Sequence, residues 1–158
     1  MRCFRPLLLT VALLLLTTGS AVASAPNPAT VVETYRASIA GAEANDSSRY
    51  GSLSADGRTI VFLSGASNLV PGDTNGVIDV FSYDTATKAI ARVSVATGGG
   101  QANGMSSTAA ISGNGNLIAY ASDADNLVGG DTNEATDVFS YDVITGITTR
   151  ISVAGGGA

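Results

Sequence analysis

The sequence contains no histidine and no tryptophan, and its only cysteine is Cys3. Without histidine, the chain lacks the commonest general base and the commonest ligand of transition metals. A single cysteine cannot form a disulfide within the chain. Serine is frequent, but none lies in a Gly-x-Ser-x-Gly motif, and no histidine is present to activate one. We therefore predict no catalytic residue and expect that the chain is not an enzyme.

Positive charge is also scarce. Eight lysines and arginines stand against thirteen acids. Arg2 and Arg5 belong to the N-terminal segment, so the rest of the chain keeps six positive side chains and a net charge of −7. An acidic surface repels nucleic acid and anionic lipid. We expect neither of them as a partner.

The N-terminal segment, residues 1–23, has the pattern of a signal peptide. Arg2 and Arg5 form a positive start, and residues 7–16 form an apolar core that is too short to span a bilayer. Ala21-Val22-Ala23 then supplies a cleavage site, with an uncleaved anchor as the alternative. No apolar run that could span a membrane follows. The mature chain is predicted to start near Ser24 and to be secreted or periplasmic.

The remaining chain contains two copies of one unit, and residues 54–95 align with residues 112–153 without a gap. Residues 68–75 resemble residues 126–133, and residues 79–84 are identical to residues 137–142. Duplication explains such a match, and internal repeats decide the architecture first. The predicted division is a signal peptide at 1–23, an N-terminal strand and linker at 24–49, a first unit at 50–97, a glycine-rich linker at 98–107, a second unit at 108–154 and a tail at 155–158.

Each unit predicts four short antiparallel strands and no helix, so the fold class is all-β. The continuous apolar runs at 59–64 and 117–122 are typical of strands buried on both faces. Asp, Asn and Gly between strands favour tight turns. The strands are expected at 50–54, 59–64, 80–83 and 89–95, and again at 108–112, 117–122, 138–141 and 147–153. Residues 31–39, which carry an Arg-x-Ser match to the end of each unit, are expected to form an extra N-terminal strand.

The segment Ser-x-Asp-Gly-Arg-x-Ile-x-Phe, residues 54–62, resembles the PD40 repeat, also called the WD40-like β-propeller repeat, of TolB-like proteins. The Asn-Leu-Val-Pro-Gly-Asp-Thr-Asn-Gly run that follows is similar to a subfamily in secreted bacterial proteins. The resemblance covers nearly all of residues 35–153. It implies a partial β-propeller of two four-stranded antiparallel blades plus an N-terminal strand. Propellers of this kind serve as binding platforms and as accessory domains of enzymes, so the resemblance is weak for function.

Closed propellers usually have at least four blades, whereas the chain carries two. Three explanations stay open. The sequence is a fragment of a longer reading frame, copies assemble as a homo-oligomer that completes a ring, or the two units stand alone as an open pair of sheets. Exposed edge strands would make the last arrangement prone to aggregation.

The best candidate for a metal site is the acidic loop that occurs once in each unit. Its Asp-x-Asn-x-x-x-Asp spacing offers oxygen ligands at positions 1, 3 and 7, and calcium prefers such hard oxygens in a flexible loop. The alternative is that these side chains cap turns and bind the backbone. The predicted calcium ligands are Asp73, Asn75 and Asp79 in the first unit and Asp131, Asn133 and Asp137 in the second.

Two further sets of residues have expected structural roles. The aromatic pair Phe81 and Tyr83, with its copy Phe139 and Tyr141, is expected to pack between neighbouring blades. Arg92 and Arg150 are expected to pair with nearby acids, and Asp84 and Asp142 are the candidates. Because the best matched acids occur twice, they are expected to be structural, since an active site is usually single.

The sequence thus favours an exported, non-enzymatic module of β-propeller type that binds another protein or an envelope polymer. Two alternatives stay open. One is a non-catalytic propeller fragment of a larger secreted hydrolase, and the other is a calcium-stabilised surface protein. No certain cofactor is predicted, with calcium as the only candidate.

Overall fold

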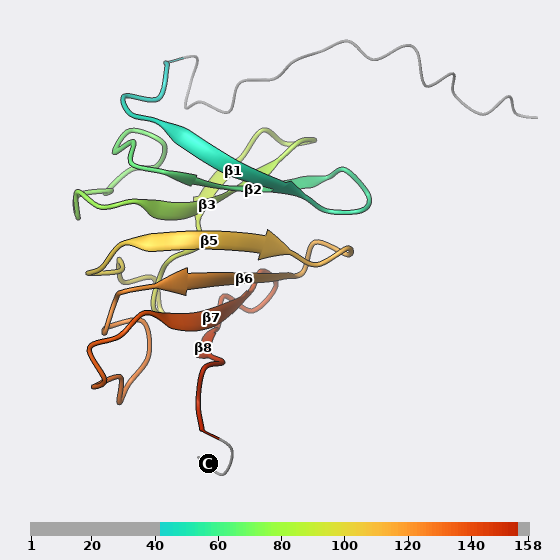
Figure 1. Ribbon diagram of the computed structural model, residues 1–158. Helices are drawn as coiled ribbons and strands as arrows, with labels where there is room; N and C mark the ends of the chain where they lie inside the picture. The colour runs from blue at the N-terminus through green and yellow to red at the C-terminus, as the bar shows by residue number, and fades with distance from the viewer. Residues whose placement is uncertain (1–41, 155–158) are drawn as a thin grey trace, which may run out of the picture. The chain divides into compact units, whose positions relative to one another are not determined.

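The computed structural model describes residues 42–154, and these residues form strands, turns and loops without any helix (Figure 1). The first sheet contains β1 (Ser48–Leu53), β2 (Thr59–Ser64), β3 (Asp79–Asp84) and β4 (Ile90–Arg92). The second sheet contains β5 (Ser106–Ile111), β6 (Leu117–Ser122), β7 (Asp137–Asp142) and β8 (Thr148–Arg150). The predicted signal peptide at 1–23, the strand at 31–39 and the tail at 155–158 lie outside the described residues.

Both sheets are antiparallel and have their strands in the order of the sequence, β1-β2-β3-β4 and β5-β6-β7-β8. Each strand of the first sheet has a counterpart of equal length at the repeat-equivalent position of the second. Even the irregularity in the first pairing recurs, between Arg49 and Ser52 and between Ser106 and Ala109. The predicted all-β class with two four-stranded antiparallel sheets is confirmed.

The apolar runs predicted the bounds of β2 and β6, whereas β4 and β8 are shorter than expected. The reason is visible at Ser94, whose hydroxyl accepts a hydrogen bond from the Val80 amide at 3.1 Å. Ser152 accepts from the Val138 amide at 3.0 Å in the same way. In each sheet a serine hydroxyl therefore accepts the hydrogen bond that a backbone carbonyl of the last strand would accept in a longer pairing. The last strands end at Arg92 and Arg150.

The turn that joins the first two strands of each sheet is held by a serine. Ser54 donates to Asp56 Oδ1 at 2.6 Å and accepts from the Thr59 amide at 2.9 Å. Gly57 follows with a φ of 71°, a left-handed conformation that favours glycine. Ser112 makes the equivalent bonds to Asn114 and the Leu117 amide. The turns predicted at these sites therefore form, although Asn114 replaces Asp56.

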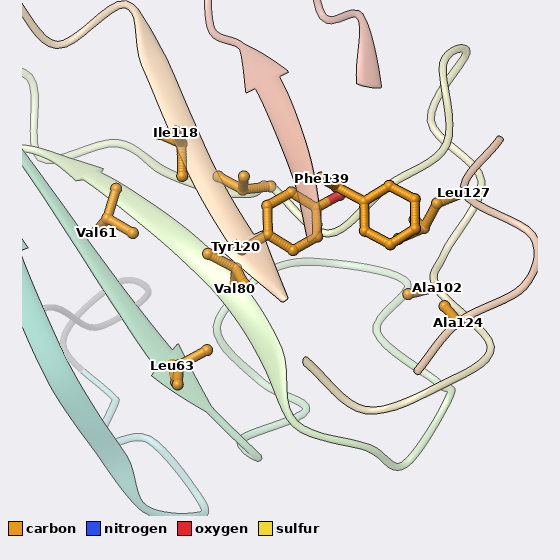
Figure 2. Close-up of a cluster of buried hydrophobic side chains, with 10 residues drawn as sticks. Val61, Leu63, Val80, Ala102, Ile118, Tyr120, Ala124, Leu127 and Phe139 are labelled. Atoms are coloured by element: carbon orange, nitrogen blue, oxygen red, sulfur yellow. The ribbon is translucent and has the colours of Figure 1, made fainter. Parts of the chain in front are cut away.

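The main hydrophobic core lies between the two sheets, as Figure 2 shows. The side chains of Val61, Leu63 and Val80 come from the first sheet, and those of Ile118, Tyr120 and Phe139 come from the second. Alternate residues of a strand point to opposite faces. The other face of the first sheet therefore carries a separate cluster, made of Phe62, Ala66, Leu69, Phe81 and Tyr83.

The two aromatic pairs occupy equivalent faces with different surroundings. Phe139 stacks on Tyr120 with ring centroids 5.8 Å apart, and Phe81 stacks on Phe62 at the same distance. Phe139 belongs to the core between the sheets, as predicted. Phe81 belongs to the cluster on the opposite face of the first sheet, where residues 42–154 supply no second sheet, so packing between blades stays a prediction for Phe81.

Candidate functional site

The acidic loop of the first unit folds around an arginine. Arg92, at the end of β4, lies 3.1 Å from Asp73 and 3.8 Å from Asp79 through its NH1 atom. Asn75 donates to Asp79 Oδ2 at 2.9 Å, and Ser94 donates to Asp79 Oδ1 at 2.5 Å. Asp79 is fully buried. We call these five residues the first acid–arginine cluster.

The second unit repeats the arrangement. Arg150 lies 2.6 Å from Asp131 and 3.4 Å from Asp137. Asn133 donates to Asp137 at 3.0 Å, and Ser152 also donates to Asp137. These residues form the second acid–arginine cluster. All six residues predicted as calcium ligands therefore lie in the two clusters, three in each.

The partners predicted for the two arginines are wrong. Arg92 and Arg150 were expected to pair with Asp84 and Asp142, yet they pair with the loop acids. The register explains the error, because Arg92 lies opposite Phe81, near the start of β3, while Asp84 lies at its far end. Asp84 instead pairs with Arg58, at 3.2 Å.

Burial and hydrogen bonding act differently on the acids of the clusters. Burial raises the pKa of Asp73, the nearby charge of Asp79 adds to the rise, and Arg92 opposes it. The hydrogen bond from Ser152 lowers the pKa of Asp137, and Asn133 and Arg150 lower it further. Buried carboxylates in such a site are stabilised by an internal cation and internal donors.

This geometry bears on the predicted calcium sites. A guanidinium lies beside Asp73 and Asp79, where a metal ion would otherwise balance their charge. Between residues 42 and 154, no group of three or more acid, histidine or cysteine side chains is placed to hold a metal ion. Calcium binding stays a prediction, and pairing with an arginine is a further structural role for these acids, which the sequence reasoning had not considered.

Melting curves with calcium and with chelator decide between the two. Because one arginine already pairs with both aspartates of each cluster, we expect the same Tm in both conditions. A ligand that bound only the folded chain would add about 2.7 kcal/mol at 100 times its Kd, which would shift the Tm by several degrees. A rise in Tm with calcium that magnesium does not reproduce would contradict our expectation and support the calcium sites.

Sequence reasoning missed Gln101, a residue that binds the arginine of the first cluster. Its Oε1 atom accepts from Arg92 NH1 at 2.8 Å and from the Thr74 amide at 3.0 Å, and its Nε2 atom donates to Thr74 Oγ1 at 2.8 Å. The next carbonyl, of Ala102, accepts from Asn75 at 3.0 Å. The linker between the units therefore completes the first cluster. The only signal in the sequence was the match of Ala102-Asn103 to Ala44-Asn45.

The same linker also binds the second unit. Asn103 donates from its amide to Asn126 Oδ1 at 3.0 Å, and Asn126 donates to the Gln101 carbonyl at 2.8 Å. The segment 43–45 binds Asn68 of the first unit with the same pattern. Asn45 donates to Asn68 Oδ1 at 3.0 Å, and Asn68 donates to the Glu43 carbonyl at 2.8 Å. Residues 101–103 thus join one unit to the next.

Asp84 predicts a measurable pH dependence. Its Oδ1 atom accepts from the Thr87 and Ala86 amides at 2.8 and 2.9 Å. The Thr87 bond, with the contribution of Arg58, lowers the pKa of Asp84 from 3.8 to about 2. A carboxylate with a lowered pKa stabilises the fold above its unfolded pKa and loses this effect as the pH falls through the folded value. We therefore expect Asp84→Asn to weaken the dependence of stability on pH between about 4 and about 2.

Urea unfolding at pH 7, 4 and 2 measures this effect, and Asp142→Asn is the matched control. Asp142 caps the equivalent turn through the Thr145 and Ile144 amides. No arginine of residues 42–154 pairs with it, because Asn116 stands where Arg58 stands in the first unit. The loss at pH 7 should therefore be smaller for Asp142→Asn. Equal pH profiles for wild type and Asp84→Asn would contradict the role of Asp84.

An open cavity of about 600 Å³ lies beside the second cluster. It is lined by Gly129, Gly130, Thr132, Asn133, Arg150, Ser152, Val153 and Ala154. In the first unit, the equivalents of Thr132, Asn133 and Arg150 are the residues that bind Gln101 and Ala102. The cavity of the second unit therefore lies at the position that the linker occupies in the first unit.

These features define an all-β chain with two blade-like sheets, each a four-stranded meander with an acid–arginine cluster around a buried aspartate. No family model and no curated protein matches the chain. Among solved structures, it is similar to TolB from Acinetobacter baumannii, with 21% identity over 66% of this chain and a TM-score of 0.45. It is also similar to a putative TolB from Agrobacterium tumefaciens, with 17% identity over 70% of this chain and a TM-score of 0.46. The chain spans 21% of the first and 32% of the second.

Proposed function

We propose that the chain is an exported, non-enzymatic module of β-propeller type that binds another protein or an envelope polymer. The observation that carries the proposal is the use of the duplicated polar residues. In each sheet, one aspartate binds an arginine, an asparagine and a serine, and these contacts fix the loop between the second and third strands. The aspartate is Asp79 in the first sheet and Asp137 in the second. Side chains that fix a scaffold in this way are not free to act on a substrate.

The residues that fix each loop differ from the residues that the loop exposes to solvent. The two clusters hold each loop to its own sheet, while loop residues such as Thr132 and Glu134 stay exposed. Rigid sheets that position exposed loops are a common basis of binding surfaces. No helix among residues 42–154 is long and apolar enough to cross a membrane.

Export is tested by the mass of the mature chain. We expect the protein produced in a bacterial host to be recovered from the periplasm or the medium and to begin at Ser24. Leu14→Arg, which interrupts the apolar core, should leave the precursor inside the cell, whereas Thr30→Arg, beyond the predicted cleavage site, should be exported normally. A full-length chain that stays in the cytoplasm of the wild-type strain would contradict the proposal.

Binding without turnover is tested with the purified mature chain. Cosedimentation with isolated peptidoglycan and cross-linking to envelope proteins measure binding, and ester, glycoside and peptide substrates measure hydrolysis. We expect saturable binding to one of the two envelope fractions and no turnover. Turnover that disappears when a single side chain of this protein is replaced would overturn the non-enzymatic assignment. The absence of binding to both fractions would overturn the binding assignment.

A further inference from the structure

We propose that Asn114 is a site of spontaneous deamidation, at which the folded chain forms mainly aspartate rather than isoaspartate. The sequence contains three Asn-Gly pairs, at 75–76, 103–104 and 114–115. Asn-Gly pairs are especially prone to this reaction, because glycine has no side chain to hinder attack by its amide nitrogen on the asparagine. The structure separates the three pairs. The reaction does not depend on what the module binds.

The modification needs no reagent besides water. The amide nitrogen of Gly115 loses its proton to solvent and attacks Cγ of Asn114. The new N–Cγ bond closes a succinimide ring while the Cγ–Nδ2 bond breaks, and the leaving nitrogen takes up a proton and departs as ammonia. Water then opens the ring at Cγ to give aspartate, or at the backbone carbonyl to give isoaspartate. No group is oxidised or reduced.

Asn75 is protected because both acceptors of its side-chain nitrogen lie in the folded core of the first unit. Its Nδ2 atom donates to Asp79 Oδ2 at 2.9 Å and to the Ala102 carbonyl at 3.0 Å. Both acceptors are fully buried residues. The nitrogen that has to leave is therefore held by the first acid–arginine cluster and by the linker.

Asn103 is protected in a similar way. Its Nδ2 atom donates to Asp125 Oδ1 at 2.6 Å, and its Oδ1 atom accepts from the Asp125 amide at 3.1 Å. The glycine after it is also tightly packed, since a Cβ atom on Gly104 would lie 2.5 Å from the carbonyl carbon of Asp123. Rotation of the side chain toward this glycine would break two hydrogen bonds in a crowded segment.

Asn114 differs at both ends of its amide group. The residue is exposed, and within residues 42–154 its Nδ2 atom donates to no partner. Its Oδ1 atom accepts from the Ser112 hydroxyl at 2.7 Å and from the Asn116 amide at 3.2 Å. Attack on Cγ places negative charge on Oδ1, and donors already directed at that atom stabilise the charge. The leaving nitrogen is unrestrained, and the carbonyl is polarised.

The reaction still has to wait for the turn to open. Gly115 is buried, and its amide donates to the Ser112 carbonyl at 2.9 Å. A turn at the end of a sheet opens at a lower cost in free energy than core strands do. Asn114 should therefore react more slowly in the folded chain than in urea, yet faster than Asn75 and Asn103.

The first unit shows that the turn accepts aspartate. Asp56 holds the position equivalent to Asn114, and its Oδ1 atom accepts from the Ser54 hydroxyl at 2.6 Å and from the Arg58 amide at 3.0 Å. These two bonds lower the pKa of Asp56. The donors that Asn114 uses are the equivalents of these groups, so a carboxylate formed there is stabilised in the same way.

Isoaspartate fits this turn less well, because it lengthens the backbone by one carbon. The neighbouring carbonyl of Gly113 accepts from the Ala55 amide of the first unit at 2.9 Å. A Cβ atom on Gly115 would lie 3.4 Å from Thr59 Oγ1, so the first unit also contacts the turn on its other side. The contacts with the first unit therefore favour opening of the ring to aspartate.

Peptide mapping of the aged protein tests the proposal at all three sites at once. The predicted mature chain is incubated at mildly alkaline pH, folded in one sample and unfolded in urea in the other. Mass and retention time identify the aspartate and isoaspartate forms of each Asn-Gly peptide. The urea sample is the matched control, in which all three pairs are expected to react at similar rates.

In the folded sample, we expect Asn75 and Asn103 to react at least about tenfold more slowly than Asn114, because their side chains are held in place. We also expect a higher ratio of aspartate to isoaspartate at Asn114 than in urea. Folded protein in which Asn75 or Asn103 reacts as fast as Asn114, or in which Asn114 stays intact, overturns the proposal. An unchanged product ratio overturns the preference for aspartate.

Two variants check the assignment and the product. Asn114→Gln keeps the amide but would have to close a six-membered ring, so the acidic species that ion exchange detects in the aged protein should disappear. Asn114→Asp supplies the product directly, and its urea midpoint should equal that of freshly prepared wild type. Acidic species that persist in Asn114→Gln contradict the assignment, and a lower midpoint for Asn114→Asp contradicts the fit of aspartate to the turn.

Discussion

Asp79→Asn is expected to lower the free energy of unfolding by about 3–5 kcal/mol, the usual cost of removing one partner from a buried ion pair. The replacement keeps the shape of the side chain, but its amide nitrogen would face either the Asn75 amide or the Ser94 hydroxyl, both of which donate to Asp79. Arg92 would lose one of its two carboxylates. The midpoint and slope of urea unfolding measure the change.

Asp137→Asn is the matched control for this experiment. It removes the same charge from the second cluster, where Arg150 and Ser152 are more exposed than Arg92 and Ser94. Water can replace part of the lost bonding there, so a smaller loss is expected. A cost below about 1 kcal/mol for Asp79→Asn would show that the first cluster does not stabilise the fold as an ion-pair network.

Leu63→Ala is expected to cost about 2–5 kcal/mol, because the side chain is buried between the two sheets and its removal leaves a cavity. Leu63 is 1% exposed. Ile151→Ala deletes an apolar side chain from the equivalent face of the second sheet, which is exposed, and should change stability by less than about 0.5 kcal/mol.

Both variants are measured by urea unfolding at a protein concentration low enough to keep the wild type monomeric. This condition matters because Ile151 is an exposed apolar side chain, and association of the protein would change its surroundings. If Leu63→Ala and Ile151→Ala had equal effects, the two sheets would not share a core in solution. The slope of the free energy of unfolding against urea concentration scales with the surface exposed on unfolding. A wild-type slope expected for one sheet alone would also indicate that the two sheets do not share a core.

The strands and turns could be predicted because they depend on local patterns. The run from Thr59 to Ser64 is apolar enough to specify a buried strand, and Asp56-Gly57 specifies the turn before it. Because the unit is duplicated, the same pattern predicts each strand and each turn a second time. The ends of β4 and β8 could not be predicted in the same way, because a serine hydroxyl competes with the backbone there.

The composition of the site was predicted in part. The spacing predicted that Asp73, Asn75 and Asp79 bind calcium, which stays a prediction, and the structure places the three side chains in one cluster. The identity of the central group depends on strand register, which decides that Arg92 lies near the start of β3. Gln101 escaped prediction because its equivalent, Glu43, has a different side chain, and because a linker residue shows no periodic pattern.

The hollow on the outer face of the second sheet has a consequence for how the two units are ordered. Ala119 and Ala121 line a space of about 200 Å³ there, at the positions that Val61 and Leu63 hold in the first sheet. Duplicated units risk exchanging places during folding, because each carries the surfaces needed to replace the other. If the second sheet took the place of the first, alanines would replace the valine and leucine of the core. The exchanged arrangement would leave an unfilled gap, so these two small residues disfavour it.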